Sequence, residues 1–157
     1  MNIWKVAAAG GEAEQITAGQ GDDLQPDISA DGSRIVFATY RESLGLAQLD
    51  RTTPPGSERP KQLSIDPART QIGPAYSPDG RHLAYFSNFK GVENEGIWVA
   101  RADGSDPVPL VQDARVNIFP KWTPDGEQLI YQSGSEYRRV SVSGGAPVTL
   151  LGKAADY

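Results

Sequence analysis

The stretch that decides the fold is GPAYSPDGRHLAYFSN, residues 73–88. Apolar residues run up to Ser77, the sequence Pro-Asp-Gly at 78–80 interrupts them, and apolar residues resume at Leu83. Asp-Gly between two apolar runs favours a tight β-hairpin, because Gly readily adopts the positive φ that such a turn requires. The stretch therefore predicts two antiparallel strands joined by a short turn.

The same pattern occurs three times in the chain. QPDISADGSRIVFAT precedes it at residues 25–39, and FPKWTPDGEQLIYQS follows it at residues 119–133. Successive turns are 48 and 46 residues apart, and the aspartate of each turn stands five residues after a proline. These residues are Asp31, Asp79 and Asp125, with Pro26, Pro74 and Pro120. Self-similarity at such a period indicates an array of supersecondary units.

Each unit is predicted to contain four short strands. The first begins after the proline, and the second is apolar on both faces. Ile35 and Phe37 point one way, and Val36 points the other; Ala84 and Ile130 take the place of Val36 in the later units. A strand that is apolar on both faces must be covered on both faces. Stacking four-stranded antiparallel sheets around an axis achieves this, so the chain is predicted to be all-β, with β-propeller blades. A two-sheet sandwich is the alternative, but its strands usually have one polar face.

The 157 residues are expected to form one partial β-propeller of about three and a half blades. Ile3-Trp4 stands 94 residues before Ile97-Trp98, so the chain opens with the third and fourth strands of a unit. The expected boundaries are 1–18 for the half blade and 24–66, 72–112 and 118–152 for the blades. An open arc would leave an apolar face at each end. We therefore expect either a piece of a longer protein or a ring that self-association closes.

Composition excludes several classes of function. The net charge is −5 and no basic run is longer than Arg138-Arg139, so no nucleic-acid partner is expected. The chain has no cysteine, which excludes disulfides and thiolate chemistry. No apolar run is long enough to span a bilayer, so no membrane insertion is expected. The first residues are strand-like and show no signal peptide.

The turn aspartates could suggest a metal site, but Asp31, Asp79 and Asp125 belong to separate blades, whereas calcium needs many oxygens at one point. We expect these carboxylates to hold the turns. No Gly-x-Ser-x-Gly sequence is present, so no hydrolase triad is expected. We predict no catalytic, metal or cofactor-binding residue in this chain, and hence no cofactor and no enzyme activity.

We expect structural roles for the single histidine and for the tryptophans. His82 begins the second strand of its unit, where the other units have Arg34 and Gln128, so it is expected to be a solvated polar residue. The tryptophans could be ligand-stacking platforms, but their strand positions favour packing. They are Trp4, Trp98 and Trp122.

Candidate binding residues occur in the loops that enter the first strand of each unit. Arg69 and Arg115 each stand five residues before the proline of their unit. Repeated arginines near the axis of a propeller could bind a carboxylate or an acidic partner. Asp66, Asp113 and Asn117 lie close to them in the sequence. We predict a binding site at the channel mouth from these five residues; the alternative is that the charges pair with one another or face water.

The motif Pro-x-x-Ser-Pro-Asp-Gly-x-x-Leu-Ala-Tyr at 74–85, with Ile-Trp-Val at 97–99 and Asp-Gly-Ser at 103–105, resembles the WD40-like repeat of the TolB-like β-propeller family. The resemblance implies a bacterial, non-catalytic scaffold or binding module with a protein or peptide partner. It also implies a periplasmic or otherwise extracytoplasmic location. Similar blades occur in prolyl-oligopeptidase relatives and in bacterial regulators. A gating propeller of a serine peptidase and a sensor domain are therefore the alternatives.

Overall fold

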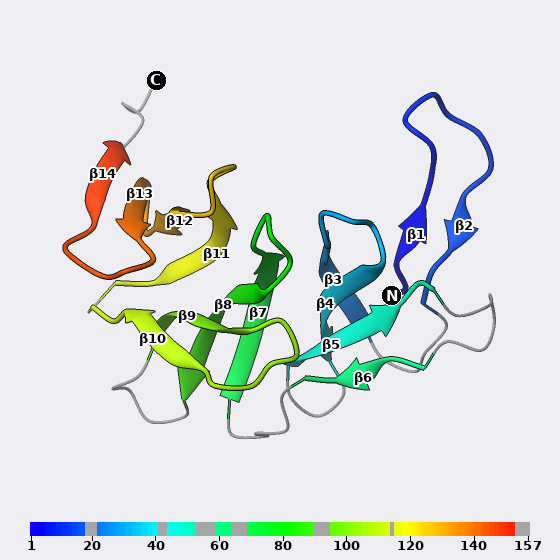
Figure 1. Ribbon diagram of the computed structural model, residues 1–157, viewed down its shortest axis with the longest axis horizontal. Coiled ribbons are helices and arrows are strands. Elements are labelled where there is room, and N and C mark those ends of the chain that lie inside the picture. Colours follow the sequence, from blue (N-terminus) through cyan, green and yellow to red (C-terminus); the bar gives the residue numbers. More distant parts are fainter. Residues whose placement is uncertain are drawn as a thin grey trace.

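The computed structural model describes residues 1–17, 22–40, 44–52, 59–63, 69–89, 95–113 and 115–152. Within these ranges the regular secondary structure is strand throughout, with no helix. The strands form three four-stranded antiparallel sheets and one two-stranded hairpin. The sheets stand side by side along the molecule (Figure 1). The predicted all-β fold with blades of four antiparallel strands is confirmed, and the sheets form part of a propeller.

The strands follow the chain order within each sheet. The half blade consists of β1 (Trp4–Lys5) and β2 (Glu14–Gln15). The first blade consists of β3 (Asp22–Ile28), β4 (Arg34–Tyr40), β5 (Leu44–Asp50) and β6 (Lys61–Gln62). The second blade consists of β7 (Arg69–Tyr76), β8 (His82–Phe89), β9 (Gly96–Arg101) and β10 (Val108–Val111). The third blade consists of β11 (Asn117–Trp122), β12 (Gln128–Ser133), β13 (Glu136–Ser141) and β14 (Val148–Leu151).

The Asp-Gly turns join the two inner strands of each blade, and the aspartate holds the turn. In the second blade, Ser77 Oγ donates to Asp79 Oδ1 at 2.5 Å, and the Arg81 N–H donates to the same oxygen at 3.0 Å. Gly80 has a φ of 68°, which a residue with a Cβ adopts only with strain. Asp31 and Asp125 accept the equivalent hydrogen bonds in the other blades. The predicted role of the three aspartates in the turns is confirmed.

The first strand of each blade is longer than the sequence suggested, because it continues through the proline. The strand register shifts at this point in β3, β7 and β11. The residue before each proline has a positive φ: 53° at Gln25, 62° at Gly73 and 54° at Phe119. A β-bulge leaves one residue out of the ladder, so the proline, which has no N–H, fits inside the strand. The expectation that the strand begins after the proline was therefore wrong.

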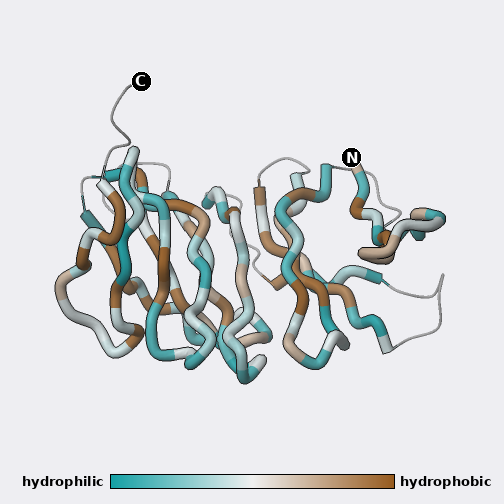
Figure 2. The backbone as a smooth tube through the Cα atoms, turned by 90° about the horizontal axis from the view of Figure 1, so that it is seen from above, coloured by the Kyte–Doolittle hydropathy of each residue, from teal (hydrophilic) through white to brown (hydrophobic). Residues whose placement is uncertain are grey.

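Apolar side chains fill both junctions between complete blades. At the first junction, between the first and second blades, Val36 packs in one cluster with Leu83 and Tyr85. At the second junction, between the second and third blades, Ala84 packs in one cluster with Leu129. Val36 and Ala84 are 0% exposed, as the two-faced apolar pattern predicted. In Figure 2, apolar segments lie within strands of successive sheets.

The two ends of the arc differ in polarity. Ile130 stands on the outer face of the third blade and is only half-buried. Where the second blade presents Phe86, Ile97 and Val99 to its neighbour, the third blade presents Gln132, Tyr137 and Arg139 at the equivalent register positions. This face is therefore mixed rather than apolar, which corrects the expectation of two apolar ends. At the other end, the apolar side chains of Trp4 and Ile28 are exposed.

Candidate functional site

The inner strands β3, β7 and β11 are tied together by contacts that cross between blades. The Gly73 N–H donates to Gln25 Oε1 at 2.8 Å, and the Tyr76 N–H donates to Asp27 Oδ2 at 2.7 Å. Lys121 Nζ lies 3.4 Å from Asp27 Oδ1, so a side chain of the third blade contacts the first blade directly. These strands lie side by side as the inner strands of the arc, and Arg69, Arg115 and Asn117 lie at or just before the starts of β7 and β11.

Three predicted residues come together before and at the start of β11. Asp113 Oδ1 accepts hydrogen bonds from the Arg115 N–H at 3.0 Å and from Asn117 Nδ2 at 2.6 Å. Arg115 Nη1 donates to Glu136 Oε2 at 2.9 Å, and Arg138 Nη1 lies 3.5 Å from Asp113 Oδ2. We call these five residues the mouth cluster. The predicted alternative, in which the charges pair with one another, describes part of this cluster.

Sequence reasoning missed Glu136 and Arg138, which β13 contributes to the mouth cluster. In the second blade, the positions with the same strand register hold Gly96 and Trp98. The two charges therefore replace a glycine and an aromatic residue, and the blade-to-blade alignment was the signal that could have identified them.

Arg69, which the repeat places in the same position as Arg115, has a different environment. Its guanidinium carbon lies 5.0 Å from the centroid of the Trp98 ring, which is a cation–π contact within the second blade. Trp98 occupies the position that Arg138 holds in the third blade. Arg69 therefore contacts an aromatic ring, whereas Arg115 contacts the carboxylate of Glu136. Asp66, the remaining predicted residue, lies outside the described residues.

A polar pair occurs in each blade near the start of the inner strand, and sequence reasoning also missed it. All of its members are buried except Thr39, which is half-buried. Each pair joins a residue of the first strand to the residue opposite it on the second. The pairs are Asp23 with Thr39, Gln71 with Ser87, and Asn117 with Ser133. In the described part of the chain, Asn117 Oδ1 and the Oγ atoms of Ser87 and Ser133 are buried with no hydrogen-bond partner. Buried polar atoms normally have hydrogen-bond partners, so these three oxygens are exceptions to the usual pairing.

Ionisation in this region follows burial. Burial raises the pKa of Tyr85 to about 12, and the nearby charge of Arg69 opposes the shift. Burial also raises the pKa of Tyr131, with Arg138 acting in the opposite direction. Both phenols therefore stay protonated at neutral pH. In the described ranges no group of three or more His, Asp or Glu side chains could hold a metal ion. The same ranges contain no helix with the length and hydropathy to cross a membrane.

No protein-family model and no curated protein matches the chain. Solved structures do. The putative TolB from Agrobacterium tumefaciens superposes with a TM-score of 0.83 at 23% identity, over 96% of this chain and 56% of that one. TolB from Acinetobacter baumannii superposes with a TM-score of 0.75 at 21% identity, over 99% of this chain and 39% of that one. The chain has a TolB-like propeller fold. A puromycin hydrolase superposes with a TM-score of 0.68 at 14% identity, over 89% of this chain and 23% of that one.

The predicted resemblance to TolB-like propellers is therefore confirmed at the level of the fold. The chain spans 56% and 39% of the length of the two TolB structures. The arc of blades accordingly corresponds to part of the propeller-containing chains to which it is similar.

Proposed function

We propose that this TolB-like propeller segment is a non-catalytic protein- or peptide-binding module, and that the mouth cluster forms its contact surface together with Arg69. The supporting observation is the mixture of groups at the starting end of β11. Charged side chains that hold one another in place lie close in the chain to Val116 and Phe119, whose side chains are exposed. Arginine and aromatic residues together are typical of protein interfaces.

The electrostatics of the mouth cluster suit an acidic partner. The Arg115 and Glu136 side chains are 51% and 29% exposed, and a surface ion pair contributes only about 0–1 kcal/mol. Displacing Glu136 from Arg115 would therefore cost little. A partner carboxylate that accepts two parallel hydrogen bonds from the guanidinium would make a stronger contact than the single bond to Glu136. We infer that the partner presents an acidic segment with an apolar side chain beside it.

Binding of a deca-glutamate peptide, measured by fluorescence anisotropy at about 0.15 M salt, tests this proposal. The double variant Arg69→Ala/Arg115→Ala should bind about tenfold more weakly and keep the circular dichroism spectrum of the parent. The matched control Arg81→Ala/Arg101→Ala removes the same charge at the other end of the strands. Equal weakening in both double variants, or no weakening in the first, would contradict the proposal.

We also propose that two copies associate through the open ends of the arc. Trp4 is 56% exposed at one end, and Val148 is 52% exposed at the other. Sedimentation velocity should show a dimer, and Trp4→Glu should shift the population toward monomer. A compact monomer at all concentrations would contradict closure by self-association.

From the resemblance to TolB-like propellers we expect an extracytoplasmic, periplasmic location in a bacterium. Cell fractionation of the gene product tests this expectation, and recovery with the cytoplasmic fraction would contradict it.

A second candidate function is the gating propeller of a serine peptidase. The structural similarity to a puromycin hydrolase favours it. The coding sequence around this segment tests it, because a Gly-x-Ser-x-Gly sequence in the same reading frame would support a peptidase. A reading frame without that sequence would contradict it.

A further inference from the structure

The first junction is closed by an arginine that crosses from one blade to the next. Arg34, at the start of β4, places its guanidinium carbon 5.1 Å from the centroid of the Tyr76 ring. Its Nη2 donates to the carbonyl oxygen of Gly80 at 2.8 Å. The planar cation therefore lies between an aromatic ring and the Asp-Gly turn of the second blade.

The second junction has the same framework without the arginine. The repeat places His82 where Arg34 stands, Trp122 where Tyr76 stands, and Gly126 where Gly80 stands. The His82 and Trp122 ring centroids are 6.4 Å apart, and the ring planes are tilted by 37°.

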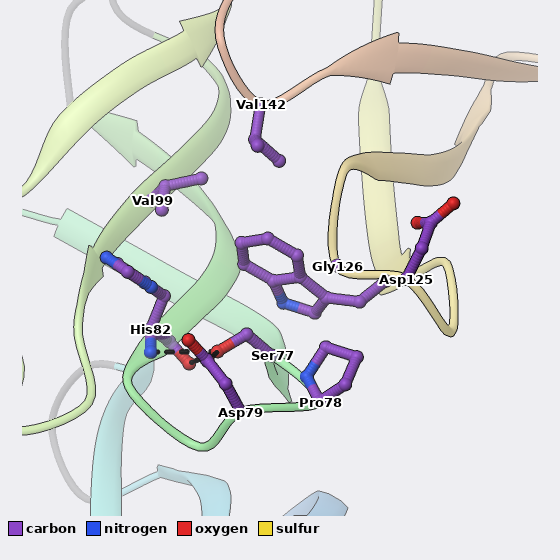
Figure 3. A pocket seen from close by; sticks show the side chains of 9 residues that line it. Ser77, Pro78, Asp79, His82, Val99, Asp125, Gly126 and Val142 are labelled. Carbon is purple, nitrogen blue, oxygen red and sulfur yellow. Dashed lines mark hydrogen bonds between the residues drawn. The ribbon is translucent and has the colours of Figure 1, made fainter.

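A cavity of about 560 Å³ lies between the second and third blades at this point, and we call it the junction cavity. Its walls include Pro78, Asp79, His82, Val99, Trp122 and Asp125. Figure 3 shows His82 and Asp79 on the side of the second blade and Asp125 with Gly126 on the turn of the third.

The walls of the junction cavity are fixed and carry negative charge. The Trp122 Nε1–H donates to the Ala75 carbonyl at 3.0 Å, which holds the indole in place. Asp79 and Asp125 each use Oδ1 to hold their turns. These hydrogen bonds lower the pKa of both carboxyls, so both are ionised at neutral pH.

We propose that the junction cavity binds the guanidinium group of an arginine side chain from a peptide or protein partner, seated against Trp122 as Arg34 is against Tyr76. The guanidinium donates to the Gly126 carbonyl, and Asp79 and Asp125 balance its charge. Arginine is preferred over lysine because a planar cation stacks on the indole and directs several N–H donors at once.

This inference goes beyond the proposed function and does not depend on it. The turns that line the junction cavity follow β7 and β11, whereas the mouth cluster lies before and at the start of β11 and at the start of β13. The two sites are therefore at opposite ends of the inner strands, and one can fail without the other.

Titration with Nα-acetyl-arginine amide, followed by the indole N–H signal of Trp122 in ¹H–¹⁵N spectra, tests the proposal. We expect a saturable shift in the millimolar range. The acetyl-lysine amide has the charge without the plane, and the acetyl-citrulline amide has the plane without the charge. Each should bind at least about fivefold more weakly. No saturable shift, or equal shifts with the lysine compound, would overturn the proposal.

Two variants separate this site from general attraction of a cation. His82→Arg places an arginine of the chain in the cavity and should abolish the shift of the Trp122 signal while the strand spectrum is kept. Asp125→Asn should weaken binding several-fold, whereas the matched control Asp103→Asn, at a turn outside the cavity, should leave it unchanged. Undiminished binding by His82→Arg, or equal weakening by the two asparagine variants, would overturn the proposal.

Discussion

The two junctions between complete blades have equivalent apolar clusters and differ at the polar and aromatic residues beside them. At the first junction, Arg34 stacks on Tyr76 and donates to the next turn. At the second, the shorter His82 faces Trp122 and a cavity remains. The apolar residues that the repeat places between blades hold the sheets together in both cases. The residue that starts the second strand of a blade decides whether the outer part of the junction is closed or open.

Truncation of either apolar cluster should give the largest effect. Leu83 and Leu129 occupy equivalent positions and are both 0% exposed. Leu83→Ala and Leu129→Ala should each lower the free energy of unfolding by about 2–5 kcal/mol, because each leaves a cavity. Urea denaturation followed by circular dichroism measures this, with the exposed Leu151→Ala as control. A cost below about 1 kcal/mol for Leu129→Ala alone would show that the second junction is loosely packed.

Replacing the aromatic residue of each junction by phenylalanine should change the free energy of unfolding by different amounts. Trp122 donates a hydrogen bond to Ala75, so Trp122→Phe should lower the free energy of unfolding by about 1–3 kcal/mol. The Tyr76 hydroxyl is buried and makes no hydrogen bond with the described residues. Tyr76→Phe should therefore change the free energy by less than about 0.5 kcal/mol or increase it. Similar losses in both variants would show that the Tyr76 hydroxyl has a partner.

Arg34 and His82 occupy the same position in the two junctions, and exchanging them should change the free energy of unfolding in opposite directions. Arg34→His removes the cation–π contact and the hydrogen bond to Gly80, and should cost about 1–2 kcal/mol. His82→Arg should form the equivalent contacts and raise the free energy of unfolding by up to about 1 kcal/mol. Thermal unfolding of both variants and of the double exchange measures these effects. Destabilisation by His82→Arg would show that the second junction cannot close in the same way.

The turns beside both junctions should make stability sensitive to acid. The Ser29 hydroxyl and the Ser33 N–H lower the pKa of Asp31 from 3.8 to about 2, and similar bonds lower the pKa values of Asp79 and Asp125. A carboxyl whose pKa is lower in the folded state stabilises the fold above its unfolded pKa. That stability should be lost as the pH falls from about 4 toward 2. The urea midpoint should fall less steeply with decreasing pH for Asp31→Asn and Asp125→Asn than for the parent protein. Parallel curves for the variants and the parent would show that these carboxyls do not cause the acid sensitivity.

Much of the fold could be predicted because the repeat is dense in local signals. Asp79-Gly80 and its two counterparts mark hairpins, and the paired apolar faces at Val36 and Ala84 require neighbours on both sides. The bulges at Gln25 and Phe119 could not be predicted in the same way. A non-glycine residue before proline normally favours an extended conformation, and only the packing of the inner strands imposes the positive φ seen here.

The candidate mouth site was only partly predictable. The repeat spacing pointed to Arg69 and Arg115, and proximity in the sequence added Asp113 and Asn117, which the fold joins to Arg115. Glu136 and Arg138 come from β13, and nothing in the local sequence linked them to that loop. Their contribution depends on how β13 pairs with β12 beside β11.

The amino-acid sequence by itself determined the repeated unit, its four strands and the need to cover both faces of each sheet. These follow from turn chemistry and from the alternation of side chains along a strand, which are properties of neighbouring residues. Only the tertiary structure decided which junction is closed, which face is mixed and which charges meet. Those outcomes depend on the reach of single side chains, such as Arg34 and His82, across the space between two sheets that are distant in the sequence.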